Sequence, residues 1–383
     1  FEKCNTNVPL DKNHNRDGCV NMHVWDMTNC YQKHTSLTLM LEQQGECSAS
    51  FDSSSYVIVN PQMARIKKRI DEVGTPLKNW EASIYRGILT GFNEAFIIDG
   101  KKKDELIFAD SKSAEIIKPI LRGRDIKRYH ADIADLWLIT TFPALKLNID
   151  DYPAVKSYLE SFGRKLYQTG EVIGLSETGQ KVKSRKKTRN KWFETQDQIA
   201  YFSEFKKEKI IYAEIVFDSA FYLDDSGIYP EATSFILTGE HLKYITALLN
   251  SRLLTFAFKA FYAGGDLRGD TFRYKKAFLH RLPVIRPADE IMSVLELIVD
   301  YIQILKREGQ TLPASYYEQL IDGLVFELYF PEKLKKVGKD ILQHLGNQVP
   351  LTKDMSEERR LAVILSEFER LYDPNHPVRN NLE

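Results

Sequence analysis

The sequence lacks any apolar run that approaches the roughly 18 to 20 residues needed to cross a bilayer. It also lacks a charged start followed by an apolar core, which is the pattern of a secretory signal peptide. We therefore expect a cytoplasmic protein without a membrane partner. Net charge is lacking too, because Lys and Arg together number 53 and so do Asp and Glu. Affinity for a polyanion can then come only from local clusters of charge.

Cysteine is scarce, and all four cysteines lie near the amino end. Two of them form a Cys-x3-His pattern twice, as Cys19/His23 and Cys30/His34, which could supply four tetrahedral zinc ligands. The spacing fits no common zinc finger or ribbon, and scattered thiols in a reduced compartment are usually inert. Inert thiols are the favoured interpretation.

Complete catalytic motifs are absent as well. The glycines of "YRGILTGFN" and "YAGGDLRGD" do not have nucleotide-binding spacing, and no Ser-His-Asp order or paired carboxylates stand out. "NPQM" at residues 60–63 lacks the second proline and the aromatic of the Asn-Pro-Pro-aromatic tetrapeptide of amino-directed DNA methyltransferases, and is better interpreted as a helix start. We expect no catalytic, cofactor-binding or metal-binding residues in this chain.

The hydrophobic patterns predict an α+β protein in three parts. Residues 1–77 combine strand-like runs, typical of the end of a larger sheet, with a helix over 61–73. Residues 78–287 contain the strand-like pieces "EASIYRGI", "EAFIID", "DLWLITTF", "KIIYAEIV", "AFYLDD" and "TSFILTG", with helical patterns in "DYPAVKSYLESFGRKLYQ" and "GEHLKYITALLNSRLLTFAFKAF". Residues 288–383 are helical almost throughout. Because the chain begins at Phe1 inside a strand-like run, we expect it to be cut from a longer protein.

Three acid-poor segments concentrate positive charge: "ILRGRDIKRY" (120–129), "KVKSRKKTRNKW" (181–192) and "GGDLRGDTFRYKK" (264–276). Each has an ordinary alternative, namely a turn whose arginines pair with acids, a solvated face or localisation signal, and a mobile surface loop. Lysines suit phosphates, whereas arginine and asparagine can pair with base edges. The candidate DNA contacts are Arg122, Arg124, Lys127, Arg128, Lys183, Arg185, Lys186, Lys187, Arg189, Asn190, Lys191, Arg268, Arg273 and Lys275. Of these, Arg122, Arg124, Arg268, Arg273 and Asn190 are the expected base readers, and the run 181–192 is expected to be mobile without DNA.

Read in order, these strings resemble the target-recognition domain of the type IIG fused restriction-modification enzymes. "GILTGFNEAF" (87–96) is similar to the Gly-x-x-Thr-Gly-x-Asn-x-Ala-Phe signature of that family, and "RGRDI" (122–126) to its Arg-Gly-x-Asp-Ile block. The resemblance extends over about 78–287 and weakly into "LIDGLVFELYFPEKL". The matched positions are Gly87, Thr90, Gly91, Asn93, Ala95, Phe96, Gly123, Asp125 and Ile126, with Arg122. We expect many of them to be architectural: Gly91 allows a tight turn, Asn93 caps it, and Phe96 and Ile97 lie in the core.

The resemblance implies a bacterial adenine-specific DNA methyltransferase, with or without a nuclease, whose specificity part is this chain. S-adenosylmethionine, and Mg2+ where a nuclease is present, would serve the parent enzyme and not this chain. The implied partners are double-stranded DNA and the missing amino-terminal methyltransferase domain. Two alternatives remain open at this point: a tail that completes a methyltransferase active site, and a helical interaction module built on Leu320, Leu324 and Leu328.

Overall fold

The computed structural model describes residues 48–51, 56–59, 61–263 and 270–383. The chain divides into two compact units, Phe1–Glu72 and Val73–Glu383. In the first, β1 (Ser48–Phe51) pairs antiparallel with β2 (Tyr56–Val59), and the expected helix begins at Pro61 as α2 (Pro61–Val73). The Cys-x3-His pairs and Arg268 lie outside the described residues, so the zinc hypothesis and that DNA contact stay predictions.

One four-stranded antiparallel sheet of the second unit has the order β14 (Phe221–Asp224), β12 (Lys209–Ala213), β16 (Ser234–Thr238) and β4 (Ser83–Arg86). These strands arise from four of the predicted strand-like pieces. Every residue of the central strand β12 is buried. Helix α6 (Leu242–Asn250) packs on this sheet, and Ile211 and Ala213 of β12 belong to the buried cluster described below, so β12 is covered on both faces.

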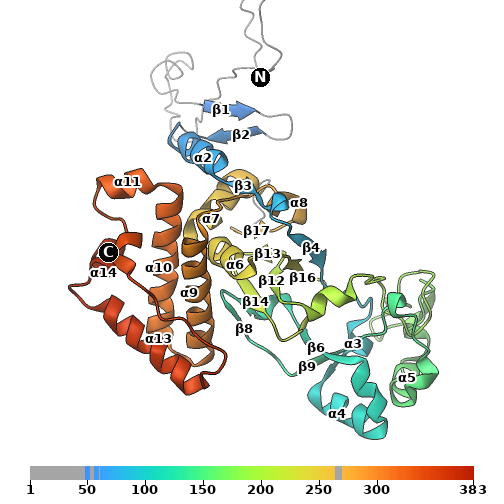
Figure 1. Ribbon diagram of the computed structural model, residues 1–383. Helices are drawn as coiled ribbons and strands as arrows, with labels where there is room; N and C mark the ends of the chain where they lie inside the picture. The colour runs from blue at the N-terminus through green and yellow to red at the C-terminus, as the bar shows by residue number, and fades with distance from the viewer. Residues whose placement is uncertain (1–47, 52–55, 60, 264–269) are drawn as a thin grey trace, which may run out of the picture. The chain divides into compact units, whose positions relative to one another are not determined.

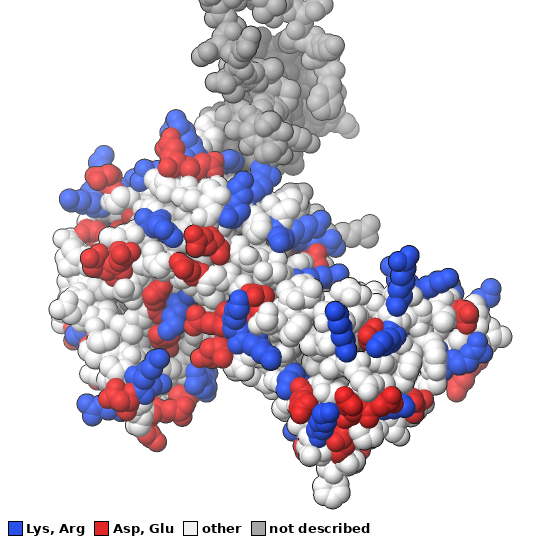
Figure 2. All heavy atoms as spheres, turned by 45° about the vertical axis from the view of Figure 1, so that its right-hand side comes forward, with Lys and Arg blue, Asp and Glu red and all other residues white. Residues whose placement is uncertain are grey.

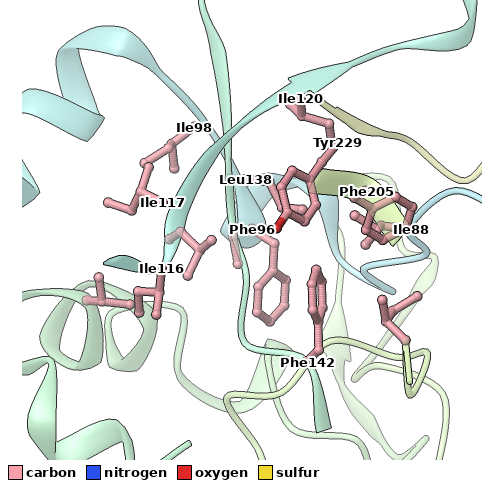
Figure 3. Close-up of a cluster of buried hydrophobic side chains, with 14 of the residues drawn as sticks. Ile88, Phe96, Ile98, Ile116, Ile117, Ile120, Leu138, Phe142, Phe205 and Tyr229 are labelled. Carbon is pink, nitrogen blue, oxygen red and sulfur yellow. The ribbon is translucent and has the colours of Figure 1, made fainter. Parts of the chain in front are cut away.

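A second four-stranded sheet has the order β15 (Tyr229–Pro230), β6 (Ile117–Leu121), β9 (Leu136–Ile139) and β5 (Ile97–Asp99). Strand β15 runs parallel to β6, and the other pairs are antiparallel. Between the elements lies a buried cluster, shown in Figure 3, in which side chains from distant parts of the chain meet. Phe96, Phe142, Phe205 and Tyr229 are among its aromatic members. This core supports the loops described below.

One local prediction was wrong, and one helix was not predicted. "EAFIID" is not a single strand, because Asn93–Phe96 forms the short helix α3 before β5 begins. Helix α4 (Gly100–Ala109) was not predicted, since the lysines of "GKKKDELIFA" interrupt any apolar stripe. Its amino end is capped by the side chain of Asp99, which accepts a hydrogen bond from the amide of Lys102 at 2.8 Å.

The predicted helices beyond this point are confirmed. They are α5 (Pro153–Glu160), α6, α7 (Arg252–Ala257), α9 (Asp289–Arg307), α10 (Thr311–Tyr329), α11 (Pro331–Lys336), α12 (Leu342–Leu345) and α13 (Glu357–Tyr372), and α14 (Pro377–Leu382) ends the chain. Helix α9 packs between α6 and α10, so the helical tail lies against the strand-rich part (Figure 1). In the leucine stripe, Leu320 and Leu324 are fully buried and belong to the core, whereas Leu328 is half-buried. The mixed α+β fold class is thus confirmed.

Among the described helices, none combines the length and the hydropathy needed to cross a bilayer.

Candidate nucleic-acid interface

A cleft of about 720 Å³ lies between the loop after β4, the turn at Gly123–Asp125 and the strand β13 (Ile215–Val216). Charged side chains of both signs line it: Arg86, Arg122 and Arg124 together with Glu94, Glu214 and Glu231. A surface of this composition offers hydrogen-bond donors and acceptors side by side. It is therefore suited to reading polar edges and less suited to holding phosphates alone.

Two signature glycines bring the walls of this cleft together. A Cβ at Gly87 would lie 2.1 Å from the carbonyl oxygen of Glu231, and one at Gly123 would lie 2.7 Å from Oγ1 of Thr233. Only glycine allows both segments to approach the 230–234 segment so closely. The resemblance to the family at these positions thus has an architectural basis, as expected.

The signature turn at Thr90–Asn93 positions one wall. Gly91 has φ +77°, and its predicted role in a tight turn is confirmed. Thr90 Oγ1 donates to Asn93 Oδ1 at 2.5 Å, and Asn93 Nδ2 donates to Glu231 Oε1 at 2.9 Å. Asn93 thereby closes the turn and fixes a carboxylate of the cleft. Phe96 is buried in the core, whereas Ile97 is half-buried: it packs against the core cluster and also lines the cleft.

The Arg-Gly-x-Asp-Ile block places two arginines in different states. Arg122 Nε lies 2.5 Å from Asp125 Oδ2, so its guanidinium is held in place. The Arg124 side chain is 73% exposed and only 4.0 Å from the same carboxyl group, which leaves it free to reorient toward a ligand. Lys127 is partly exposed at 3.7 Å from Asp132.

Arg128 was predicted to contact DNA, but the structure assigns it to the contact with the helical tail. Its guanidinium lies 3.4 Å from Glu318 of α10 and 3.7 Å from Asp218. Glu318 also accepts from Lys306 at 2.7 Å. Because these acids hold Arg128 within the protein, it is corrected from a DNA contact to a structural ion pair.

The basic run of residues 181–192 begins in a hairpin, in which β11 (Lys181–Lys183) pairs with β10 (Val172–Leu175). Lys183, Lys186, Lys187 and Arg189 are exposed, and none forms an ion pair with a described residue. Lys191 is exposed too, with its Nζ 5.6 Å from the centre of the Phe193 ring. In Figure 2, Lys and Arg gather along the upper edge of the part that carries α4 and α5, above a band of Asp and Glu. The run thus offers cations that a polyanion can neutralise.

Two members of the run are not available for DNA. Arg185 is 5% exposed, and its guanidinium donates to the carbonyl of Thr90 at 2.8 Å and lies 4.9 Å from the centre of the Phe96 ring. Burial lowers its pKa to about 10. Asn190 Nδ2 donates to the carbonyls of Thr195 and Gln196 at 3.0 and 2.9 Å, and its Oδ1 accepts from Gln198. Both residues are corrected from DNA contacts to internal supports of the loop.

Described residues of all three predicted basic segments lie in or near the cleft. Arg86 in its wall and Lys186 of the basic run both lie near Asp197. Burial raises the pKa of the Asp197 carboxyl, and the charges of Arg86 and Lys186 oppose that rise. On the other side, Ile215 of the cleft is paired with Arg273 of β17 (Phe272–Arg273). Lys275 follows, exposed, with its Nζ 5.6 Å from the centre of the Phe278 ring.

The sequence interpretation missed Arg86, Glu214 and Glu231. One signal could have identified Arg86: it is the only basic residue of the predicted strand "EASIYRGI", and it directly precedes the signature residue Gly87. The glutamates carried no signal, because only the fold brings them opposite the arginines. Within the described ranges, no group of three or more His, Cys, Asp or Glu side chains could hold a metal ion.

Residues 118–284 match the TaqI-like C-terminal specificity domain, and the predicted resemblance is thereby confirmed. No curated protein matches the chain.

Two similar solved structures are the type IIL restriction-modification enzyme MmeI, in complex with DNA, and the type IIG restriction endonuclease BpuSI. MmeI has 13% identity and a TM-score of 0.44, with 76% of this chain and 35% of that chain covered. BpuSI has 13% identity and a TM-score of 0.42, with 73% and 36% covered. The chain thus spans about a third of the length of either enzyme.

Proposed function

We propose that this chain recognises a short double-stranded DNA sequence as the specificity part of a cytoplasmic restriction-modification adenine methyltransferase, and that it is not itself catalytic. The observation that carries the proposal is the arrangement of four exposed, unpaired cations of the basic run beside a cleft lined by arginines and glutamates. The relationship of residues 118–284 to a specificity domain supports it. MmeI, a structural neighbour, was solved in complex with DNA.

The two surfaces suit different tasks. Lys183, Lys186, Lys187 and Arg189 would hold phosphates, because they are exposed and lack carboxylate partners in the described structure. The cleft would read base edges. Arginine donates to guanine, and a carboxylate such as Glu214 accepts from the amino group of cytosine.

The parent enzyme would supply the chemistry. S-adenosylmethionine would bind the missing methyltransferase domain, which would flip and methylate an adenine next to the sequence read here. Mg2+ would be needed only if the parent also carries a nuclease. None of these steps is assigned to a residue of this chain.

The test is binding of a panel of duplexes by the 383-residue chain, measured by fluorescence anisotropy from 50 to 400 mM salt. A phosphate-binding surface makes the logarithm of the affinity fall linearly with the logarithm of the salt concentration, and a cleft that reads bases makes some duplexes bind more tightly than others. An affinity that does not change with salt concentration would refute the proposal. Turnover of S-adenosylmethionine or metal-dependent nicking by the chain alone would show that it completes an active site instead.

A further inference from the structure

The two-stranded ribbon of β13 and β17 borders the cleft and has two unlike faces. Its register pairs Ile215 with Arg273 and Val216 with Phe272. Val216 packs against the core cluster and Phe272 is buried, so this pair faces inward. Ile215 and Arg273 therefore share the outward face, since directly opposed residues of a strand pair point to the same side.

The outward face continues along both chain segments. Phe217 directly follows β13, and Lys275 lies two residues beyond Arg273, so an exposed ring and an exposed lysine flank the outward pair. Phe217 is 72% exposed and Ile215 is 50% exposed. An aromatic ring and a branched aliphatic side chain are thus presented to solvent next to two cations.

The backbone beneath these side chains is fixed. Lys259 Nζ donates to the carbonyl of Phe217 at 2.8 Å, and the amide of Tyr274 donates to the carbonyl of Glu214 at 2.9 Å. The adjacent Ser219 is buried, with its Oγ 2.6 Å from Oγ1 of Thr255. The exposed ring therefore stands on a rigid support. Little conformational entropy is lost when it contacts a partner.

The cations on this face indicate what the partner is. Arg273 Nε is enclosed without a hydrogen-bond partner in the described structure, and Lys275 is exposed. Lysine is depleted at the centre of protein–protein interfaces, which argues against a protein partner. DNA offers phosphates for the cations and base faces or steps for apolar side chains.

We propose that Phe217, supported by Ile215, inserts against the base stack of bound DNA and locally unstacks one base step, while Arg273 and Lys275 hold neighbouring phosphates. Phe217 is thus a positioning side chain for the duplex. The assignment rests on the proposed DNA-recognition function. The Phe217 contact would favour DNA sequences in which this base step is easily unstacked, and it would not depend on the hydrogen-bonding groups of the bases.

The experiment uses the 383-residue chain and a duplex selected from a random library for tight binding. 2-Aminopurine, whose fluorescence rises when it is unstacked, replaces the bases of that duplex one at a time. The variants are Phe217→Ala, Phe217→Leu and the control Phe108→Ala, which removes a ring that is 96% exposed on α4. Thermal unfolding of each variant checks that the fold is retained.

We expect the unaltered chain and Phe108→Ala to raise the fluorescence at one base step. Phe217→Ala should abolish the rise and weaken binding by about 5- to 150-fold, the range that loss of a base-aromatic contact gives, without changing the salt dependence. Phe217→Leu should retain part of both effects, since an aliphatic wedge still fills the step.

Other results would overturn the inference. Salt-dependent duplex binding without a fluorescence rise at any position would reject the Phe217 assignment and leave the proposed function standing, as would equal effects of Phe217→Ala and Phe108→Ala. Failure of the chain to bind any duplex would reject the proposed function itself and the inference with it. Self-association that Phe217→Ala abolishes, without a fluorescence rise, would show that the ring contacts a protein.

Discussion

Replacing Lys183, Lys186 and Lys187 together by alanine tests whether the basic run holds phosphates. Each of these side chains is exposed and unpaired with any described acid, so the variant removes three charges and disrupts no internal ion pair. A cation that neutralises one phosphate contributes about 0.9 to the slope of log affinity against log salt, so the triple variant should flatten the slope by about 2.7. Between 50 and 200 mM salt, the affinity of the unaltered chain would then fall about 40-fold more than that of the variant.

A matched variant separates local contact from overall charge. Lys333, Lys335 and Lys336 of α11 are three exposed lysines of the helical tail, and no described acid pairs with them. Their replacement changes the net charge by the same amount, and we expect it to leave the slope nearly unchanged because α11 is not among the elements that line the cleft. Anisotropy titrations of both variants against several duplexes measure the difference. If both variants flattened the slope of log affinity against log salt equally, the basic run would not contact the phosphates directly. If the variant of the run lost binding to one sequence alone, the run would read bases.

The remaining predictions concern internal charges. Arg185→Ala should lower the free energy of unfolding by about 2–4 kcal/mol in denaturant titrations, because buried carbonyls lose their donor, whereas Lys187→Ala should change it by less than about 0.5 kcal/mol. Asp224→Asn should cost about 3–5 kcal/mol, since it leaves the fully buried Lys209 ammonium, 2.5 Å away, without its counter-charge; little loss would mean that water solvates this pair. Asp197→Asn should strengthen DNA binding by about two- to fivefold at neutral pH. The pKa of Asp197 is raised, so the unaltered chain should gain the same factor as falling pH protonates this carboxyl, and the variant should not.

Much of the fold could be predicted because its signals are local. In the strands of the first sheet, apolar residues alternate with polar ones or form continuous runs. Gly91 and Pro61 mark a turn and a helix start by their own backbone preferences. Helix α4 escaped prediction because it is polar on most sides and is defined by its cap and by packing against β9 and α5. The cleft escaped as well, since Glu214 and Glu231 are far from Arg122 in the sequence and meet it only through the strand order.

Arg185 shows why composition alone could not assign the basic run. In the sequence it is one of seven positive residues in a stretch without acids, and nothing distinguishes the seven as phosphate contacts. In the structure its guanidinium donates a hydrogen bond to the carbonyl of Thr90 in the signature turn and packs on the ring of Phe96. A loop crowded with like charges needs such an internal anchor if its remaining cations are to point outward together. The residue that contributes nothing directly to a DNA contact is thus the one that makes a defined arrangement of Lys183, Lys186 and Lys187 possible. Replacing it should weaken DNA binding through the loop's order.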